Sequence, residues 1–169
     1  MKTIVRKMKD QDLRWITAIE KVSFRNSFWD KRKFTNYPGL VAEVEKFVVG
    51  YALYQEQSRT IHLLRMAVTP QLRRRSVGKK IIESLAASLS LDRLVRIETV
   101  VEAENVTAQF FLKQCRFRAF GTVTNDQNEE YYLFECALPG FESSFYSHRP
   151  RNRNRPCQPA NRITQYLQP

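Results

Sequence analysis

Five cations crowd the start of a predicted helix, where basic residues are disfavoured. They are Arg73, Arg74, Arg75, Lys79 and Lys80. The N-terminus of a helix has a partial positive charge and four N–H groups with no partner inside the helix, so it favours acidic residues. The small residues Ser76 and Gly78 would let backbone N–H groups approach an anion closely. The segment therefore predicts a phosphate or pyrophosphate site rather than a merely solvated helix start.

This segment resembles the acyl-CoA pyrophosphate loop of the GNAT N-acetyltransferase family, whose pattern is Gln/Arg-x-x-Gly-x-Gly/Ala. Residues 73–78 match it as Arg-Arg-Arg-Ser-Val-Gly, with Ser76 at the place of the first glycine. We expect this departure to be mild, on the condition that the backbone of Ser76 keeps an ordinary conformation. The segment contains neither the Walker pattern nor G-x-G-x-x-G.

Two further segments extend the resemblance. Residues 105–108 (Asn-Val-Thr-Ala), followed by Phe111, Leu112 and Phe117, are similar to the second signature of the family, Asn-x-x-Ala-x-x-Leu-Tyr and then Gly-Phe. Residues 28–30 (Phe-Trp-Asp), with a phenylalanine at 34, are similar to the Phe-Pro-Trp-Ser segment of ribosomal-protein alanine N-acetyltransferases of the RimI type.

The resemblance implies that acetyl-CoA, as co-substrate, binds between two splayed parallel strands at about 60–68 and 94–101. Backbone groups of Met66, Ala67 and Val68 would pair with the pantetheine arm, and Asn105 would reach the arm from the other side. The residues implied to hold the pyrophosphate are Arg73, Arg74, Arg75, Ser76, Val77, Gly78 and Lys79.

The proton-transfer residues of RimI-like enzymes are not matched. Their glutamate base lies five residues before the motif asparagine and their tyrosine acid seven residues after it; here these places are Val100 and Leu112. A direct attack still requires the substrate ammonium, with a pKa near 10, to lose a proton. Two substitutes for the base are His62, at the place where histone-type members carry a glutamate, and Glu98, two residues before Val100 on the same strand face.

The thiolate could take its proton from Tyr131 or Tyr132, or from no side chain at all. Cys115 is better explained as a core residue at a helix end than as an acid or nucleophile.

Hydrophobic periodicity predicts the order β-α-α-β-β-β-α-β-α-β-β and a mixed α/β fold in a single domain. About seven strands would form a central sheet flanked by helices, as in the GNAT fold. We place the domain at residues 1–140 and an arginine-, proline- and asparagine-rich tail, extended or disordered, at 141–169.

The chain has 169 residues and a formal net charge of +11, so it is drawn to anions. The tail would serve as an arm for RNA or ribosome contact, or as a solubilising extension. No apolar stretch is long enough to span a membrane, and the three cysteines fit neither a disulfide framework nor a zinc site. We expect a cytoplasmic protein without a bound metal.

The function expected from the sequence is transfer of an acetyl group from acetyl-CoA to a primary amine by direct attack in a ternary complex. The amine could belong to a protein N-terminus, such as that of a ribosomal protein, to a lysine or to a small molecule. The alternative is a protein that binds acyl-CoA with little or no transfer and acts as a sensor or a basic adaptor on RNA or ribosomes.

Overall fold

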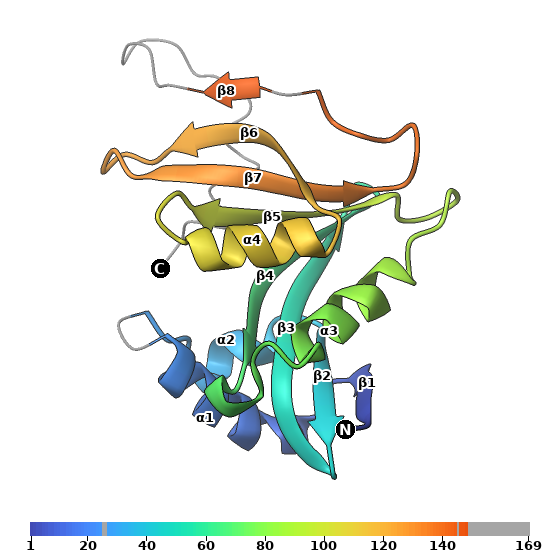
Figure 1. Cartoon of the computed structure of the whole chain (residues 1–169), viewed down its shortest axis with the longest axis vertical. Helices are drawn as coiled ribbons and strands as arrows, with labels where there is room; N and C mark the ends of the chain where they lie inside the picture. The colour runs from blue at the N-terminus through green and yellow to red at the C-terminus, as the bar shows by residue number, and fades with distance from the viewer. Residues whose placement is uncertain (25–26, 145, 149–169) are drawn as a thin grey trace. The chain divides into compact units, whose positions relative to one another are not determined.

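The computed structural model describes residues 1–24, 27–144 and 146–148, which form two compact units, 1–97 and 98–169. The first unit holds four strands and three α-helices (Figure 1). In chain order its elements are β1 (Thr3–Lys7), α1 (Leu13–Ser23), α2 (Lys31–Thr35), β2 (Gly39–Val44), β3 (Phe47–Gln57), β4 (Thr60–Val68) and α3 (Val77–Ala86). Short 3₁₀ turns, Asp10–Asp12 and Pro70–Leu72, lead into α1 and follow β4.

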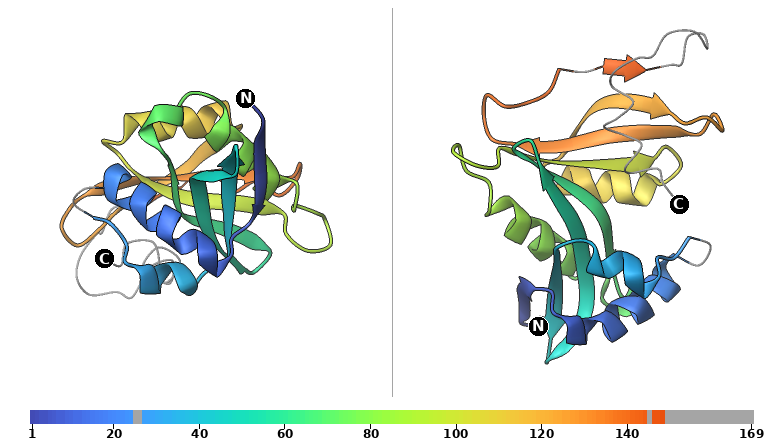
Figure 2. Two further views of the ribbon diagram at one scale, coloured as in Figure 1. Left: turned by 90° about the horizontal axis from the view of Figure 1, so that it is seen from below. Right: turned by 180° about the vertical axis from the view of Figure 1, so that it is seen from behind.

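Strands β1 to β4 are consecutive neighbours in an antiparallel arrangement. Helices α1 and α3 cover opposite faces of it (Figure 2). The α1 face includes Tyr51, which packs in one cluster with Leu13, Ile16 and Ile19 of α1. The neighbouring Gly50 faces the other way, toward Ile81 of α3, because successive strand residues point to opposite faces.

Helix α1 departs from a regular apolar stripe in its last turn. Helical spacing places Val22 on the same face as Ile19, yet Val22 is 54% exposed, whereas Glu20 is fully buried. Asp30 caps the start of α2, since its carboxylate accepts a hydrogen bond from the Lys33 N–H at 3.0 Å.

The second unit comprises the remainder of β5 (Arg96–Glu102) from Glu98 on, with α4 (Val106–Gln114), β6 (Arg118–Thr124), β7 (Glu130–Ala137) and β8 (Tyr146–His148). Its strand order is β5-β7-β6-β8, with β6 antiparallel to β7 and parallel to β8. Strand β5 alternates between half-buried and buried residues up to the exposed Glu102, so one of its faces is only partly covered.

The order of elements confirms the mixed α/β class. Residues 146–148 of the predicted tail form β8, and residues 149–169, the part richest in arginine, lie outside the described residues. In the part of the chain that the structure describes, no helix is long and apolar enough to cross a membrane. Nor do three His, Cys, Asp or Glu side chains gather there in a way that could hold a metal ion.

A largely buried ion-pair network joins the 3₁₀ turn Asp10–Asp12 to β1 and β2. Arg6 donates to both oxygens of Asp12, at 2.7 and 2.8 Å, and also to Glu43. The Asp12 side chain is only 3% exposed and also accepts from the Lys9 N–H at 2.8 Å. Its hydrogen bonds with Arg6 are the main reason that the pKa of Asp12 is lowered.

Replacing Asp12 by Asn should destabilise the protein in a pH-dependent way. Because the folded pKa lies below the unfolded value of about 3.9, the stabilisation is complete above that value and is lost as the pH falls through the folded pKa. At pH 7 we expect Asp12→Asn to lower the free energy of unfolding by about 3 kcal/mol, since Arg6 loses its buried partner. The difference from wild type should shrink toward pH 2 in urea unfolding.

The exposed Asp10 provides the control, because Asp10→Asn should change the stability by less than about 0.5 kcal/mol at any pH. A loss in Asp12→Asn that stays constant from pH 7 to pH 2 would contradict the assignment.

Candidate acyl-CoA site

The backbone groups of β4 point alternately to the two edges of the strand, and one edge bonds to β3. Thr69 N–H donates to Val49 O at 2.8 Å, and the register pairs Ala67 with Tyr51 and Val68 with Gly50. In an antiparallel ladder, bonding to one neighbour alternates along the strand, so the N–H and C=O of Ala67 point to β3. Those of Met66 and Val68 point to the opposite edge.

This parity corrects one detail of the expected cofactor contacts. The backbone groups of Met66 and the N–H of Val68 are not used in the β3 ladder, and the Val68 C=O accepts a hydrogen bond from Arg73 Nε, whereas the backbone of Ala67 is already committed to that ladder. Ala67 instead contributes its buried side chain to the cluster on the α1 face.

Gly50 is a residue of this region that the sequence analysis missed. A Cβ atom there would lie 3.1 Å from the Ala67 carbonyl oxygen and 3.2 Å from Val68 Cγ2. A larger residue would therefore push on β4 directly at the candidate backbone sites. A lone glycine inside a strand pattern was the available signal, since it indicates a close approach of another backbone.

The loop between β4 and α3 turns through the left-handed region twice. Arg74 has φ +59°, and Ser76 has φ +62° and ψ +6°. We expected serine in place of the family's first glycine to be a mild departure if the Ser76 backbone kept an ordinary conformation. It does not, because this left-handed conformation is one that glycine adopts without cost. A non-glycine residue in this conformation costs about 1–2 kcal/mol.

The turn exposes the start of α3 to a ligand. The first helical hydrogen bond runs from the Lys80 N–H to Ser76 O at 3.0 Å, so the N–H groups of Val77, Gly78 and Lys79 have no partner within the helix. The Ser76 side chain does not cap them. Together with the exposed side chains of Arg74 and Arg75, these donors form a positively charged environment that suits a pyrophosphate.

Arg73 plays a different part from the other loop cations. Its Nε donates to Val68 O at 3.0 Å, and its terminal nitrogen contacts Ser23 Oγ at 3.2 Å. In this structure Arg73 braces the loop against the end of β4 and the end of α1.

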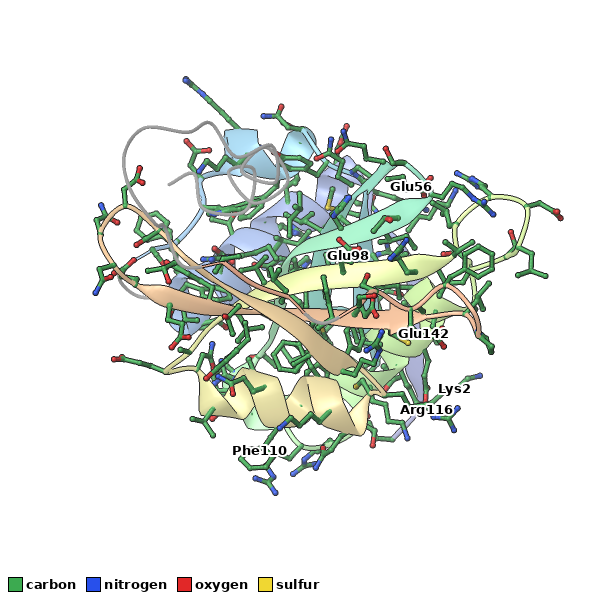
Figure 3. The ribbon with its side chains drawn as sticks, turned by 90° about the horizontal axis from the view of Figure 1, so that it is seen from above. Lys2, Glu56, Glu98, Phe110, Arg116 and Glu142 are labelled. Atoms are coloured by element: carbon green, nitrogen blue, oxygen red, sulfur yellow. The ribbon has the colours of Figure 1, made fainter. Side chains whose placement is uncertain are left out.

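The two base candidates lie in different units of the chain. His62 lies on β4 opposite Gln55 and is 6% exposed. Glu98, labelled in Figure 3, is half-buried on β5, on the same strand face as Val100.

Apolar side chains fill the two family positions for acid and base. Val100 packs against Phe120, Val123 and Leu133, and Leu112 is 4% exposed. Neither could exchange a proton. Asn105, implied to reach the pantetheine arm, caps α4 by accepting a hydrogen bond from the Ala108 N–H at 3.1 Å; its cofactor contact stays a prediction.

Tyr131 is a poor choice for the acid. Burial, together with a 3.0 Å hydrogen bond to Glu129 and that residue's charge, raises its pKa to about 12. A higher pKa makes the phenol a weaker proton donor to a thiolate. Tyr132, the other candidate, lies opposite Thr122 on the β6–β7 pair.

Sequence reasoning also missed a buried polar cluster beside β4. The Glu20 carboxylate accepts from Tyr51 OH, from the Trp29 N–H at 2.9 Å and from Arg65 at 2.6 and 3.0 Å. The helical pattern places Glu20 next to Ile19, but a single carboxylate beside an apolar stripe does not reveal which cation it meets.

Comparison with known proteins decides the family. The family model described as Acetyltransferase (GNAT) family matches residues 7–117. The chain belongs to this family. The expected GNAT fold is thereby confirmed, and no curated protein sequence matches the chain.

Solved structures agree with the fold at low identity. The ribosomal-protein-S18-alanine N-acetyltransferase of Escherichia coli aligns with TM-score 0.70 at 17% identity, over 85% of this chain and 100% of that one. Naa20 of Chaetomium thermophilum, in complex with a bisubstrate analogue, gives 0.72 at 16%, over 86% and 96%. The PaiA N-acetyltransferase of Thermoplasma acidophilum, in complex with coenzyme A, gives 0.67 at 15%, over 82% and 100%.

The left-handed backbone of Ser76 leads to a pair of opposite expectations. Ser76→Gly should leave the free energy of unfolding unchanged or raise it by up to about 1 kcal/mol, because glycine has no Cβ to clash. Ser76→Val should lower it by about 1–2 kcal/mol, since a β-branched residue fits this conformation worst. Urea unfolding of both variants measures the effect; equal stabilities would contradict the backbone geometry.

Proposed function

We propose that this GNAT family member is an N-acetyltransferase that carries the acetyl group of acetyl-CoA to a primary amine. The observation that carries the proposal is the paired arrangement of β4 and α3. A strand edge presenting Met66 and Val68 runs into a left-handed turn and a helix start whose first N–H groups have no partner within the helix, beside exposed arginines. An extended amide chain that ends in a pyrophosphate has this same order of groups.

The chain's own residues would divide the work as follows. The backbone N–H and C=O of Met66 and the backbone N–H of Val68 pair with the amides of the pantetheine arm. The N–H groups of Val77, Gly78 and Lys79, with Arg74 and Arg75, hold the pyrophosphate. These contacts place the thioester without using any side chain as a nucleophile.

Direct attack of the amine on the thioester requires one base to take a proton from the amine nitrogen. The amine nitrogen, once it has lost its extra proton, forms a bond to the thioester carbonyl carbon, and the carbon–sulfur bond breaks to release the CoA thiolate. A proton leaves the nitrogen for the base, and the thiolate takes one from an acid or from water. His62 and Glu98 are the base candidates.

The acceptor that we propose to test first is a protein N-terminus. The E. coli protein described above supports this choice, because it shares the fold and is named for an alanine of ribosomal protein S18. A lysine or a small amine is the next choice, because a primary amine is all that the reaction requires.

A second candidate function rests on the missing acid and base. With Val100 and Leu112 both in apolar surroundings, the protein could bind acyl-CoA without fast transfer and act as a basic adaptor on RNA or ribosomes. This alternative predicts binding to RNA that weakens steeply with salt and that disappears when residues 141–169 are removed.

Acetyl-CoA should bind with micromolar affinity through the loop. Calorimetric titration should show this binding in the wild type, and the double variant Arg74→Glu/Gly78→Glu should weaken it by at least about a hundredfold, because two carboxylates would face the pyrophosphate. Arg14→Glu/Ala18→Glu, on the exposed side of α1, changes the net charge equally and should bind normally. Equal loss in both variants would mean that only net charge matters.

The base should be revealed by thiol release in the presence of peptide and amine acceptors. Loss of the true base should lower kcat by about 10²–10⁴. We expect His62→Ala to show this loss, and Glu98→Gln if the second candidate is correct, with acetyl-CoA affinity unchanged in either case. If both variants keep the wild-type rate, neither residue is the base. If the wild type binds acetyl-CoA but no acceptor releases thiol, the adaptor function takes first place.

A further inference from the structure

The cluster around Glu20 lies on the α1 face of β4, next to the candidate cofactor edge. Arg65 precedes Met66 directly, and its register partner Leu53 is in the same buried cluster as α1. The Arg65 side chain is 16% exposed and the Glu20 side chain is fully buried. These two charges are therefore inside the protein and depend on each other.

The bonds of this pair lead to one short stretch of backbone. Arg65 donates to Ser27 O at 2.6 Å as well as to Glu20, and Glu20 accepts from the Trp29 N–H at 2.9 Å. The pair thus holds a carbonyl and an N–H group of the connection between α1 and α2.

Aromatic rings complete the attachment. The Arg65 guanidinium lies 3.5 Å from the centre of the Phe24 ring and 5.4 Å from that of Trp29. Lys33 lies 5.1 Å from the Trp29 ring. Cations beside an aromatic ring stabilise its position. Trp29 is therefore held at its indole ring by the two cations and at its backbone by Glu20.

The direction of the cofactor places this stretch near the chemistry. If the pyrophosphate binds at the start of α3, the pantetheine arm runs back along β4 past Val68, and its thioester ends near Met66. An amine that approaches from the α1 face then meets Ser27, the 52% exposed Phe28 and Trp29. The α3 face of the strand is covered by that helix.

We propose that Arg65 is a positioning residue for the acceptor: through Glu20 it holds Ser27 and Trp29 in the place where the incoming amine binds. This inference rests on the proposed transferase function. Arg65 touches neither substrate; it acts through the backbone that it fastens.

The test compares two buried ion pairs of one kind. Arg65→Gln breaks the pair with Glu20. Arg6→Gln breaks the pair that joins β1 to Asp12, in the turn before α1. The two arginine side chains are 16% and 24% exposed, respectively. Both variants should unfold at lower urea concentration. Only Arg65→Gln should speed hydrogen exchange of the Trp29 amide, by about tenfold or more.

The kinetic readout separates positioning from stability. Arg65→Gln should raise the KM for the acceptor by about tenfold, while the Kd for acetyl-CoA stays within about twofold. Arg6→Gln should change neither constant. If Arg65→Gln does not fold, the double variant Glu20→Leu/Arg65→Met removes both charges, avoids an unpaired buried ion and should show the same KM effect.

Three outcomes overturn the proposal. An unchanged Trp29 exchange rate in Arg65→Gln shows that the pair does not hold this backbone. An unchanged acceptor KM, or an equal rise in Arg6→Gln, shows that the held backbone does not bind the acceptor. If the wild type acetylates no amine, the proposed transferase function fails and the acceptor role falls with it, whereas the exchange rate still decides whether Arg65 fastens Trp29.

Discussion

Strand β4 can bond to β3 along only one edge, and most of the candidate site depends on that constraint. The ladder to β3 uses Ala67 and leaves the backbone of Met66 and Val68 directed to the other edge. A backbone edge recognises an amide chain through hydrogen bonds that need no particular side chain. The site can therefore tolerate side-chain change along β4, but it cannot tolerate a shift of register by one residue.

The left-handed turn after β4 serves the same end at a cost in stability. Arg74 and Ser76 take conformations that L-residues avoid, and Arg73 ties the turn to Val68 and Ser23. Backbone strain of this kind persists where the surrounding structure over-determines it, and it gathers at binding sites. The result is a helix start with neither a side-chain cap nor an acidic residue in its first turn, where cations stand instead.

Buried charge is used twice in the first unit, with different consequences. Arg6, Asp12 and Glu43 join strands and the first turn, so their loss affects folding. Arg65 and Glu20 reach backbone atoms of a connection between helices, so their loss frees a surface. Buried ion pairs contribute little net stability compared with apolar residues, but they specify geometry because an unpaired buried charge is so unfavourable.

The sequence by itself determined the class of fold, the helix with five cations at its start and the family. The sequence also located β4 at Thr60–Val68, because the strand follows from local spacing. It also showed that Val100 and Leu112 cannot transfer protons. Tertiary structure alone decided which backbone groups of β4 face outward, since that depends on the register with β3.

Tertiary structure likewise decided that Ser76 is left-handed, that Arg73 is a brace and that Glu20 meets Arg65, 45 residues away in the chain. These pairings arise only when distant segments pack together, and no spacing within one segment carries that information.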